Sequence, residues 1–439
     1  MKDYQLLING YWVNSRSGKL GEIFNPSTEE VVGHVQMGNE IDADLALHAA
    51  YEAQKSWKKI PARRRAEYLR AFTKEIRANK RRLAELLVQE QGKLISWAEM
   101  EVEVTCTFIE YACDGARAIE GDLVESDNEN EHIWIHKIPR GVIVAITAWN
   151  FPLALAGRKI GPALVAGNTM VLKPTMETPL ATLELGALAK KAGLPDGVLN
   201  IVTGKGSELG NALVKNPITK MVTMTGSTPA GRKIFEAAAQ NLTYVQLELG
   251  GKAPCIVFDN ADLDNAVEGA FHSRFDNCGQ ICTCNERLYV HEKIYDRFME
   301  KFMAKVKKLK VGNPMDDSVD IGPKVNGSEI KNLEYLVAKS IEEGATIAAG
   351  GSALKEGKYA KGHWFAPTII TDVRQDMTVV HEESFGPLLP VLKFSDFDEV
   401  MGYANDCDYG LSAMIFAQDM NTILKCKDEL EFGEIYVNR

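Results

Sequence analysis

The sequence predicts an α/β fold with mainly parallel sheets, and two observations lead to this prediction. From residue 142 onward, short apolar segments rich in β-branched residues alternate with segments of helical length, as in VIVAITA, TMVLK, VLNIVTG and KMVTMTG. Strands that alternate with helices in this way form parallel βαβ units, which bind ligands at the carboxyl ends of their strands. A second α/β stretch begins near residue 250, and because 439 residues exceed what one core usually holds, we expect two domains, with three as the alternative.

The N-terminal third is expected to contribute a hairpin, several helices and an extended arm. LLINGYWVNS alternates around Asn9-Gly10, which is the strongest short signal for a hairpin. Residues 41–116 place apolar residues at three- and four-residue spacing, which indicates helices. The basic run PARRRAEYLRAFTKEIRANKRRL keeps this spacing, so we interpret it as the solvated face of a helix and not as a nucleic-acid patch. Residues 118–138 break the helical pattern and are typical of an arm that pairs with another subunit.

The composition excludes several classes of protein. Hydrophobic residues make up 45% and charged residues 25% of the chain, the profile of a soluble globular protein. The net charge of −10 argues against a nucleic-acid surface and is common among enzymes of small metabolites. No apolar run is long enough to span a bilayer, and the N-terminus lacks the features of a signal peptide. We therefore expect a cytoplasmic enzyme with reduced cysteines and no membrane or nucleic-acid partner.

Two glycine-containing turns follow predicted strands. VTGKGSELG contains Gly204, Gly206 and Gly210, a spacing that differs from the standard dinucleotide fingerprint and that a plain glycine loop would also explain. TGSTPAG places Gly226 and Ser227 before a proline at a helix start, which is good capping chemistry and a ready anion site. Two such turns in one βαβ region favour a dinucleotide.

Three further turns carry polar groups next to apolar strands. Asn150 in AWNFPL offers an amide donor that could stabilise an oxyanion or simply cap a turn. Glu248 in LELGGK places a carboxylate in an apolar run, which is costly unless the group is paired or functional, and a raised pKa would suit a general base. EESFGP, from Glu382 to Pro387, is an acidic and aromatic turn.

The segment NCGQICTCNER concentrates three of the eight cysteines, Cys278, Cys282 and Cys284. Zinc sites usually need a second cluster of cysteine or histidine ligands, which the sequence lacks, and a C-x-x-C redox motif is absent. We therefore expect no metal. A nucleophilic thiol remains, and such a thiol needs an oxyanion donor and a nearby base, which Asn150 and Glu248 could supply.

Taken together, these motifs resemble the aldehyde dehydrogenase superfamily over essentially the whole chain. The motifs occur in the family's order: WNFP, KIGPALVAGNTMVLKP, GSTPAG, LELGGKAP, FDNCGQIC and EESFGP. The resemblance implies a Rossmann-type cofactor domain, an α/β catalytic domain and a small β oligomerisation arm. It places an NAD(P)-binding domain at residues 1–117 and 139–248, the arm at 118–138 and the catalytic domain at 249–439.

The resemblance also assigns roles to individual residues. Cys282 would be the nucleophile, with Cys278 and Cys284 as bystanders. The oxyanion would lie between the Asn150 amide and the Cys282 backbone N–H. Glu248 would activate water to hydrolyse the thioester, and Lys159 would aid proton movement. The residues expected to line the cofactor site are Thr147, Trp149, Lys173, Met176, Gly206, Gly226, Ser227, Leu249, Glu383 and Phe385.

The cofactor is expected to be NADP or NAD, and one departure from the family favours NADP or dual use. Many NAD-preferring members carry a glutamate at the position of Met176, where it binds the ribose hydroxyls and repels a 2′-phosphate. Met176 can do neither, which leaves Lys173 and Thr175 able to meet a phosphate. The alternative is that Glu177, one residue further on, compensates.

Within the family, the sequence is similar to dehydrogenases of small hydroxy-aldehydes, namely lactaldehyde and glycolaldehyde, with glyceraldehyde as a close alternative. Arg158 stands where many relatives place an aromatic residue, and a cation there suits a hydroxylated or carboxylated aldehyde. A surface arginine beside Lys159 is the alternative interpretation. Members that transfer the acyl group to coenzyme A lack the base, so Glu248 favours hydrolysis to the free acid.

The C-terminal end of the sequence raises a further expectation. The chain stops at FGEIYVNR, where the resemblance leads us to expect more residues that supply a loop over the substrate and the last strand of an intersubunit sheet. A homo-oligomer, dimer or tetramer, is expected if that part is complete. A catalytically impaired member of the same fold is the alternative if it is missing.

Substitution of the cysteines one at a time tests the assignment of the nucleophile. Cys282→Ala is expected to abolish aldehyde-dependent NAD(P) reduction, because no other thiol occupies the motif position. Cys278→Ala and Cys284→Ala should retain most of the activity, measured as initial rates with a small hydroxy-aldehyde. Equal loss in all three variants would favour a shared role for the cluster.

Overall fold

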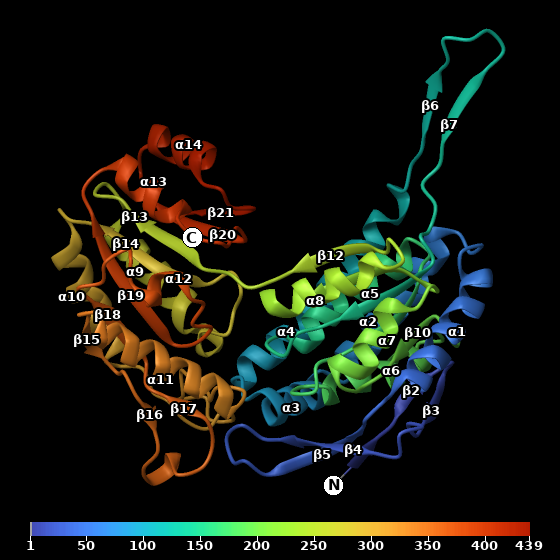
Figure 1. The fold of residues 1–439 in the computed structure, drawn as a ribbon, viewed down its shortest axis with the longest axis horizontal. Coiled ribbons are helices and arrows are strands. Elements are labelled where there is room, and N and C mark those ends of the chain that lie inside the picture. Colours follow the sequence, from blue (N-terminus) through green and yellow to red (C-terminus); the bar gives the residue numbers. More distant parts are fainter. Residues whose placement is uncertain (1) are drawn as a thin grey trace. The chain divides into compact units, whose positions relative to one another are not determined.

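The computed structural model describes residues 2–439 and divides the chain into two compact units. The first unit comprises residues up to Phe24 together with Val31–Glu90 and Ser96–Glu248. The second unit comprises Asn25–Glu30, Gln91–Ile95 and Leu249–Arg439. Each unit contains its own seven-stranded sheet, and each is described separately below (Figure 1).

The sheet of the first unit confirms the predicted parallel strands and the predicted hairpin. Its strand order is β12-β11-β8-β9-β10-β2-β3. The parallel strands are β8 (Val142–Ile146), β9 (Thr169–Lys173), β10 (Leu199–Ile201), β11 (Thr219–Thr225) and β12 (Tyr244–Glu248). Strands β2 (Leu6–Ile8) and β3 (Tyr11–Val13) form the antiparallel hairpin around Asn9 and Gly10, whose φ angles of 51° and 75° are the left-handed values that a tight hairpin turn requires.

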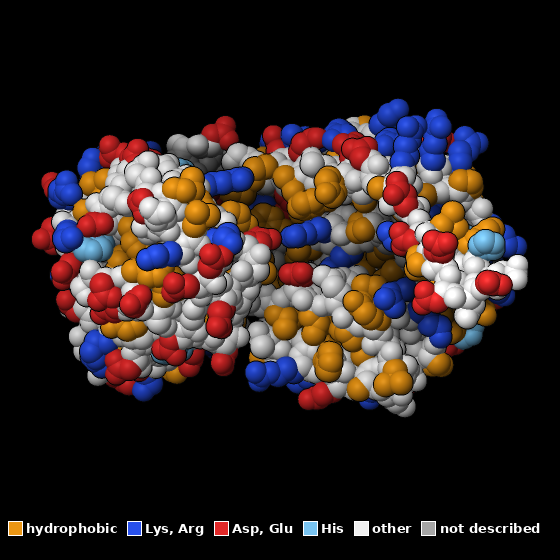
Figure 2. Space-filling view, turned by 90° about the horizontal axis from the view of Figure 1, so that it is seen from above, with side chains coloured by type: hydrophobic (Ala, Val, Ile, Leu, Met, Phe, Trp, Pro, Cys, Tyr) orange, Lys and Arg blue, Asp and Glu red, His pale blue; other side chains and the backbone are white. Residues whose placement is uncertain are grey.

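Helices cover this sheet and confirm the helical pattern of residues 41–116. They are α1 (Glu40–Trp57), α2 (Ala62–Ala78), α3 (Lys80–Gln91), α4 (Ile95–Asp114), α5 (Pro152–Val165), α6 (Leu180–Lys191), α7 (Asn211–Lys215) and α8 (Thr228–Ala239), with the short turns η1 (Gly115–Arg117) and η2 (Gly206–Gly210). The basic run forms α2 and the start of α3, and the apolar residues Leu69, Phe72 and Ile76 of α2 are buried. The interpretation of this run as an amphipathic helix is therefore confirmed. On the face seen in Figure 2, both units carry acidic and basic side chains.

Two smaller β elements belong to the first unit. Strands β1 (Lys2–Tyr4), β5 (Val31–Gln36) and β4 (Leu20–Phe24) form a three-stranded sheet. Strands β6 (Asp122–Glu125) and β7 (His132–Ile135) pair antiparallel and project away from the rest of the unit as a hairpin (Figure 1). Every residue of β6 and β7 is exposed, including Leu123 and Trp134 at 80% and 68%. The extended segment expected within residues 118–138 is thus a hairpin that carries exposed apolar side chains.

The sheet of the second unit has the order β15-β18-β19-β14-β13-β20-β21. These strands are β13 (Ala253–Val257), β14 (Asn285–His291), β15 (Thr346–Ala349), β18 (Thr368–Thr371), β19 (Leu388–Phe394), β20 (Ser412–Phe416) and β21 (Glu434–Val437), and β15 alone is antiparallel to its neighbour. The helices are α9 (Leu263–Phe275), α10 (Tyr295–Val306), α11 (Gly327–Glu342), α12 (Thr378–His381), α13 (Phe397–Asn405) and α14 (Met420–Glu429). The minor elements are η3 (Asp276–Gly279), η4 (Gly357–Tyr359), β16 (Ala353–Leu354) and β17 (Trp364–Phe365).

This second sheet is buried on both faces. Alternate residues of one strand belong to different apolar clusters: Ile256 packs with residues of α11 and α13, whereas Cys255 and Val257 pack with residues of α9 and α10. Side chains of a strand alternate between faces, so the pattern places one cluster on each side of the sheet. Across residues 2–439, no helix combines the length and the apolar character that a membrane span requires.

Candidate active site

Four parallel strands of the first unit end at one edge of its sheet, and most of the predicted site residues lie there. Ile146 pairs with Lys173 at the ends of β8 and β9, and Thr225 pairs with Glu248 at the ends of β11 and β12. This is the edge at which parallel sheets bind ligands. The predicted residues at or just beyond these strand ends are Thr147, Trp149, Asn150, Lys173, Met176, Gly226, Ser227 and Glu248.

The strand ends offer suitable groups for a dinucleotide. Ser227 is the N-cap of α8, and its hydroxyl accepts a hydrogen bond from the backbone N–H of Ala230 at 3.4 Å. The start of α8 therefore presents a capped helix N-terminus, which favours phosphate. Thr147 is buried, and its hydroxyl has no hydrogen-bond partner among residues 2–439. A buried hydroxyl without a partner is costly, and a bound polar ligand would satisfy it. These residues fit a nicotinamide dinucleotide.

The segment after β9 carries the residues that concern cofactor choice. Burial lowers the pKa of Lys173 to about 8 against the opposing influence of Glu177, and the Lys173 ammonium donates to the Pro174 carbonyl at 3.3 Å. The Glu177 carboxylate accepts a hydrogen bond from the hydroxyl of Thr175. Gly206 opens the turn η2, and a Cβ there would meet open space, so close backbone packing does not require this glycine.

Lys159 and Glu248 are linked within the first unit by hydrogen bonds. The Lys159 ammonium, buried on α5, donates to the Thr223 hydroxyl at 3.1 Å, and the Gln246 amide donates to Glu248 Oε1 at 3.1 Å. Thr223 and Gln246 complete the link between them. Burial lowers the pKa of Lys159 to about 8, and the nearby Arg158 cation adds to the effect while the Glu248 carboxylate opposes it. Arg158 is exposed, and its guanidinium lies 5.3 Å from the centre of the Phe108 ring.

Asn150 is buried two residues before the start of α5, in the turn that also holds Thr147 and Trp149. The Trp149 carbonyl accepts a hydrogen bond from Thr178 at 3.2 Å, which ties the turn after β8 to the segment after β9. The turn is thereby fixed at the edge of the sheet.

The cysteine cluster lies in the second unit, directly after α9. Asn277, Cys278 and Gly279 have successive φ angles of 49°, 59° and 68°, a left-handed run that a cysteine rarely adopts. Arg274 stabilises this run by donating to the Gly279 carbonyl at 2.7 Å and to the Asn285 carbonyl at 2.8 Å. A Cβ at Gly279 would collide with the Gly386 carbonyl, so the turn requires glycine for space as well as for φ.

Exposure separates the three cysteines. Burial raises the pKa of Cys278 to about 11 and the pKa of Cys284 to about 12, so both are protonated and unreactive near neutral pH. Cys282 is only half-buried. Gly251 approaches the Cys282 backbone so closely that a Cβ at residue 251 would collide with the Cys282 carbonyl. Within residues 2–439, no cluster of three or more His, Cys, Asp or Glu side chains is arranged to hold a metal ion.

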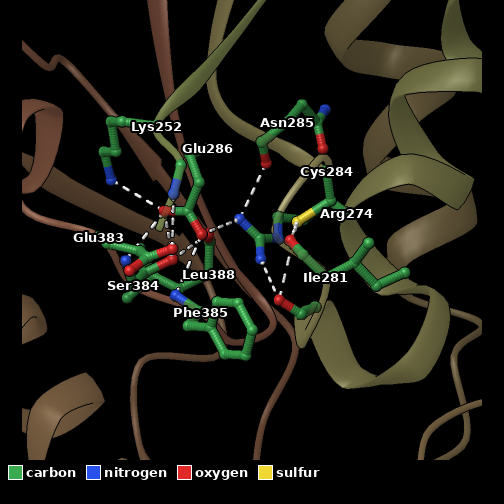
Figure 3. A network of polar contacts seen from close by, with 12 residues as sticks. Lys252, Arg274, Ile281, Cys284, Asn285, Glu286, Glu383, Ser384, Phe385 and Leu388 are labelled. Atoms are coloured by element: carbon green, nitrogen blue, oxygen red, sulfur yellow. Dashed lines mark hydrogen bonds and ion pairs between the residues drawn. The ribbon is translucent and has the colours of Figure 1, made fainter. Parts of the chain in front are cut away.

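The turn with Glu383 and Phe385 rests on a buried ionic network in the same unit (Figure 3). At its centre is Glu286, which forms ion pairs with Lys252 and Arg274, each at 2.9 Å. The carboxylate also accepts hydrogen bonds from the backbone N–H groups of Ser384 at 2.9 Å and Phe385 at 3.0 Å. Burial alone would raise the pKa of Glu286, but the two cations and the hydrogen bond from the Ser384 backbone outweigh burial and lower it to about 2.

Glu383 itself lies against the turn that follows Leu249. Its Oε1 accepts a hydrogen bond from the Gly251 backbone N–H at 2.9 Å. Burial and the nearby Glu286 carboxylate raise the pKa of Glu383 to about 7, against the opposing effects of that bond and of Lys252. Phe385 adopts a left-handed φ of 45°, and its carbonyl accepts a hydrogen bond from Lys324. The second unit therefore brings Leu249, Cys282, Glu383 and Phe385 to connected turns.

Sequence reasoning missed several residues that shape these sites. Glu101, buried on α4, accepts the backbone N–H groups of Leu153 and Ala154 and so caps α5. Glu90 caps α6 in the same way, through Leu180 and Ala181. Glu101 could have been noticed from the sequence, because it is a carboxylate at a position where the periodicity of an amphipathic helix predicts a buried side chain. Thr223 and Gln246 were also missed, because only their pairing across strands brings them together.

The first unit has a sheet edge that suits a dinucleotide, and the second unit has an accessible thiol on a fixed turn; both features are expected of a dehydrogenase that uses a cysteine nucleophile. The chain matches the model of the Aldehyde dehydrogenase family over residues 12–439 and belongs to that family. It is an oxidoreductase of the class that oxidises aldehydes with NAD(P). The resemblance inferred from the motifs, and the fold that it implied, are confirmed.

Individual relatives make the comparison more specific. The chain is 61% identical over 439 residues, 100% of its own length and 92% of the relative's, to 3,6-anhydro-alpha-L-galactose dehydrogenase of Vibrio sp. (strain EJY3). A solved structure of 3,6-anhydro-L-galactose dehydrogenase in complex with NAP superposes with a TM-score of 0.98 at 61% identity, covering 100% of this chain and 92% of that one. Lactaldehyde dehydrogenase of Escherichia coli (strain K12) is 41% identical over 437 residues, 99% of this chain and 90% of the relative.

The ionic network predicts a large loss of stability when its central carboxylate is removed. Glu286→Ala leaves two buried cations without their counter-ion, and we expect the free energy of unfolding to fall by about 3–5 kcal/mol. Equilibrium urea unfolding measures the change. The exposed Glu292→Ala serves as control and should stay within about 0.5 kcal/mol of the parent protein. A change below about 1 kcal/mol for Glu286→Ala would show that the network does not stabilise the fold.

The raised pKa of Glu383 predicts that the free energy of unfolding decreases as the pH rises. A carboxyl group with a pKa of about 7 in the folded protein and 4.5 as its ordinary value binds its proton more tightly when folded. Its ionisation therefore removes stability as pH rises from about 4.5 to about 7. Glu383→Gln should lose less stability than the parent protein between pH 5 and pH 8, by on the order of 2–3 kcal/mol. Urea unfolding across this range tests the effect, with the exposed Glu382→Gln as control, and parallel curves for parent and Glu383→Gln would contradict it.

Proposed function

We propose that this chain oxidises a 2-hydroxyaldehyde to the corresponding acid with NAD(P), through a thioester on Cys282 that is hydrolysed with Glu248 as base. The observation that carries the proposal is the difference among three neighbouring thiols. Cys278 and Cys284 are buried with strongly raised pKa values, whereas Cys282 is half-buried on a turn that backbone geometry and Arg274 hold in place. A fixed and accessible thiol is what covalent catalysis needs.

In the proposed chemistry, residues of this chain act one after another. The Cys282 thiolate attacks the aldehyde carbon, and the oxyanion is stabilised by the Asn150 amide and the Cys282 backbone N–H. When bound, a nicotinamide dinucleotide supplies the hydride acceptor that allows the adduct to become a thioester. Glu248 then takes a proton from water as that water attacks the thioester carbon, and the Cys282 sulfur leaves. Lys159, with a pKa of about 8, can exchange protons near neutral pH.

The proposed substrate class follows from what the candidate aldehydes share. Lactaldehyde, glycolaldehyde and glyceraldehyde each carry a hydroxyl on the carbon next to the aldehyde, and so does 3,6-anhydro-L-galactose in its open-chain aldehyde form. The relative named for the anhydro sugar is 61% identical and the one named for lactaldehyde is 41% identical, which supports the larger polyhydroxylated aldehyde. Arg158, exposed on α5, supports this choice as a donor to substrate hydroxyls.

For the cofactor we propose NADP, with NAD as a second substrate. Met176 provides no carboxylate to repel a 2′-phosphate, and Lys173 and Thr175 lie on the same segment. The Glu177 carboxylate is exposed and bonded to Thr175, so its ability to replace the missing glutamate is limited. The similar solved structure in complex with NAP, which we interpret as NADP, supports this preference.

We also propose that the hairpin of β6 and β7 joins copies of this chain in a homo-oligomer. The hairpin exposes Leu123, Ile133 and Trp134, an apolar set that is unusual for a solvated strand pair, and Ile138 just beyond β7 is exposed as well. The acidic composition and the small-metabolite chemistry support the cytoplasm as the compartment.

Initial rates across a small panel test the proposed activity. We expect reduction of NADP, and more slowly of NAD, with 3,6-anhydro-L-galactose, lactaldehyde and glyceraldehyde, because all three present a 2-hydroxyaldehyde, and weaker reduction with succinate semialdehyde. Coenzyme A should not be required, since water completes the reaction.

The Cys282→Ala variant provides the baseline for this panel. Absence of cofactor reduction with every aldehyde would contradict the proposed activity, and strict dependence on coenzyme A would replace it with acyl transfer. A strong preference for NAD would overturn the argument from Met176.

A further inference from the structure

Two residues outside the family motifs join the proposed base to the buried lysine. Thr223 on β11 and Gln246 on β12 face each other in the parallel register of these strands, two residues before the pair of Thr225 and Glu248. Residues two apart on a strand share a face of the sheet, so the Gln246 and Glu248 side chains lie on the same side.

The hydrogen bonds that connect Lys159 to Glu248 all run in the same direction, with each donor on the Lys159 side and each acceptor on the Glu248 side. The Lys159 ammonium donates to Thr223 Oγ1 at 3.1 Å. The Thr223 hydroxyl, which has one proton, then donates to Gln246 Oε1. Because its oxygen faces Thr223, the Gln246 amide directs its Nε2 to Glu248 Oε1 at 3.1 Å. Lys159 thus determines the orientation of the Gln246 amide through Thr223, and that amide determines which oxygen of Glu248 is held.

We propose that Gln246, oriented by Thr223, is a positioning residue for Glu248 in thioester hydrolysis. The inference rests on the proposed function. The amide holds Oε1 of Glu248, so Oε2 accepts the proton when water attacks the acyl carbon and the Cys282 sulfur departs. An amide is suited to this task because it remains neutral at any working pH and does not compete with Glu248 for the proton.

A cofactor-independent measurement isolates the hydrolytic step. Brief exposure to p-nitrophenyl acetate acetylates the accessible thiol, and rapid desalting removes the excess ester. Mass spectrometry of the intact chain then gives the lifetime of the acetyl-enzyme. We expect Gln246→Ala to lengthen this lifetime about tenfold, the equivalent of one lost hydrogen bond to a charged group, while the rate of acetylation stays within about twofold.

Three further variants separate positioning from folding. Gln246→Glu keeps the shape and the acceptor for Thr223 but places a carboxylate against Glu248, so its acetyl-enzyme should live at least as long as that of Gln246→Ala. Thr223→Val should lengthen the lifetime and Thr223→Ser, which retains the hydroxyl, should restore it. Gln240→Ala, an exposed glutamine at the end of α8, is the matched control and should behave as the parent protein.

The outcomes distinguish the inference from the function on which it rests. Equal acetyl-enzyme lifetimes for the parent protein and Gln246→Ala would overturn the role of Gln246 and leave the proposed function intact. Failure of the parent protein to take up acetyl at Cys282, judged against Cys282→Ala, would overturn the proposed function and this inference together.

Discussion

The ion pairs and hydrogen bonds of the buried Glu286 carboxylate are the interactions on which the turns of the second unit depend. It lies on β14, two residues beyond Cys284, and is bound by Lys252 and Arg274 with almost no exposure to solvent. Charges removed from water destabilise a protein unless each is paired and hydrogen-bonded, and here Arg274 and the backbone donors of Glu286 also belong to the turns that they fix. Arg274 holds the turn before Cys282, while the N–H groups that Glu286 accepts belong to the turn with Phe385. One buried anion therefore fixes the two turns to which the nucleophile and the nicotinamide are assigned.

Those turns need such an anchor because their backbones are strained. Cys278 and Phe385 both adopt left-handed conformations that side chains other than glycine and asparagine rarely occupy. Each such residue costs on the order of 1–3 kcal/mol, and it persists only where the surroundings enforce it. Arg274 and Lys324 enforce it here by donating to carbonyls of the two turns. On the proposed function, the strained turn preorganises the Cys282 thiol, which then does not have to be ordered when a substrate arrives.

Much of this arrangement could be predicted from the sequence. The rest could not be predicted, and the reason is physical. The hairpin at Asn9 and Gly10 and the parallel strands could be predicted because hydrophobic periodicity and turn chemistry are local. The resemblance supplied the proposed roles of Cys282 and Glu248, because both residues lie inside recognisable motifs. Glu101, Thr223 and Gln246 escaped notice, because their roles arise from register and helix packing between segments far apart in the chain. Glu286 lies next to the cysteine cluster in the sequence, but its role could not be predicted, because its two cationic partners come from other elements of the fold.

Two buried lysines lie near the same edge of the first unit's sheet, and a different task is assigned to each. Burial lowers the pKa of both Lys159 and Lys173 to about 8, and a carboxylate opposes the effect in each case. Near neutral pH both remain largely cationic. Lys173, at the end of β9, adds positive charge where an anionic cofactor is expected, whereas Lys159 directs its proton donors through Thr223 towards the end of β12. On the proposed function, the same physical feature, a lysine partly removed from water, serves cofactor binding at the end of β9 and proton transfer near the end of β12. A lysine with its ordinary pKa could serve the first role but would release a proton too reluctantly for the second.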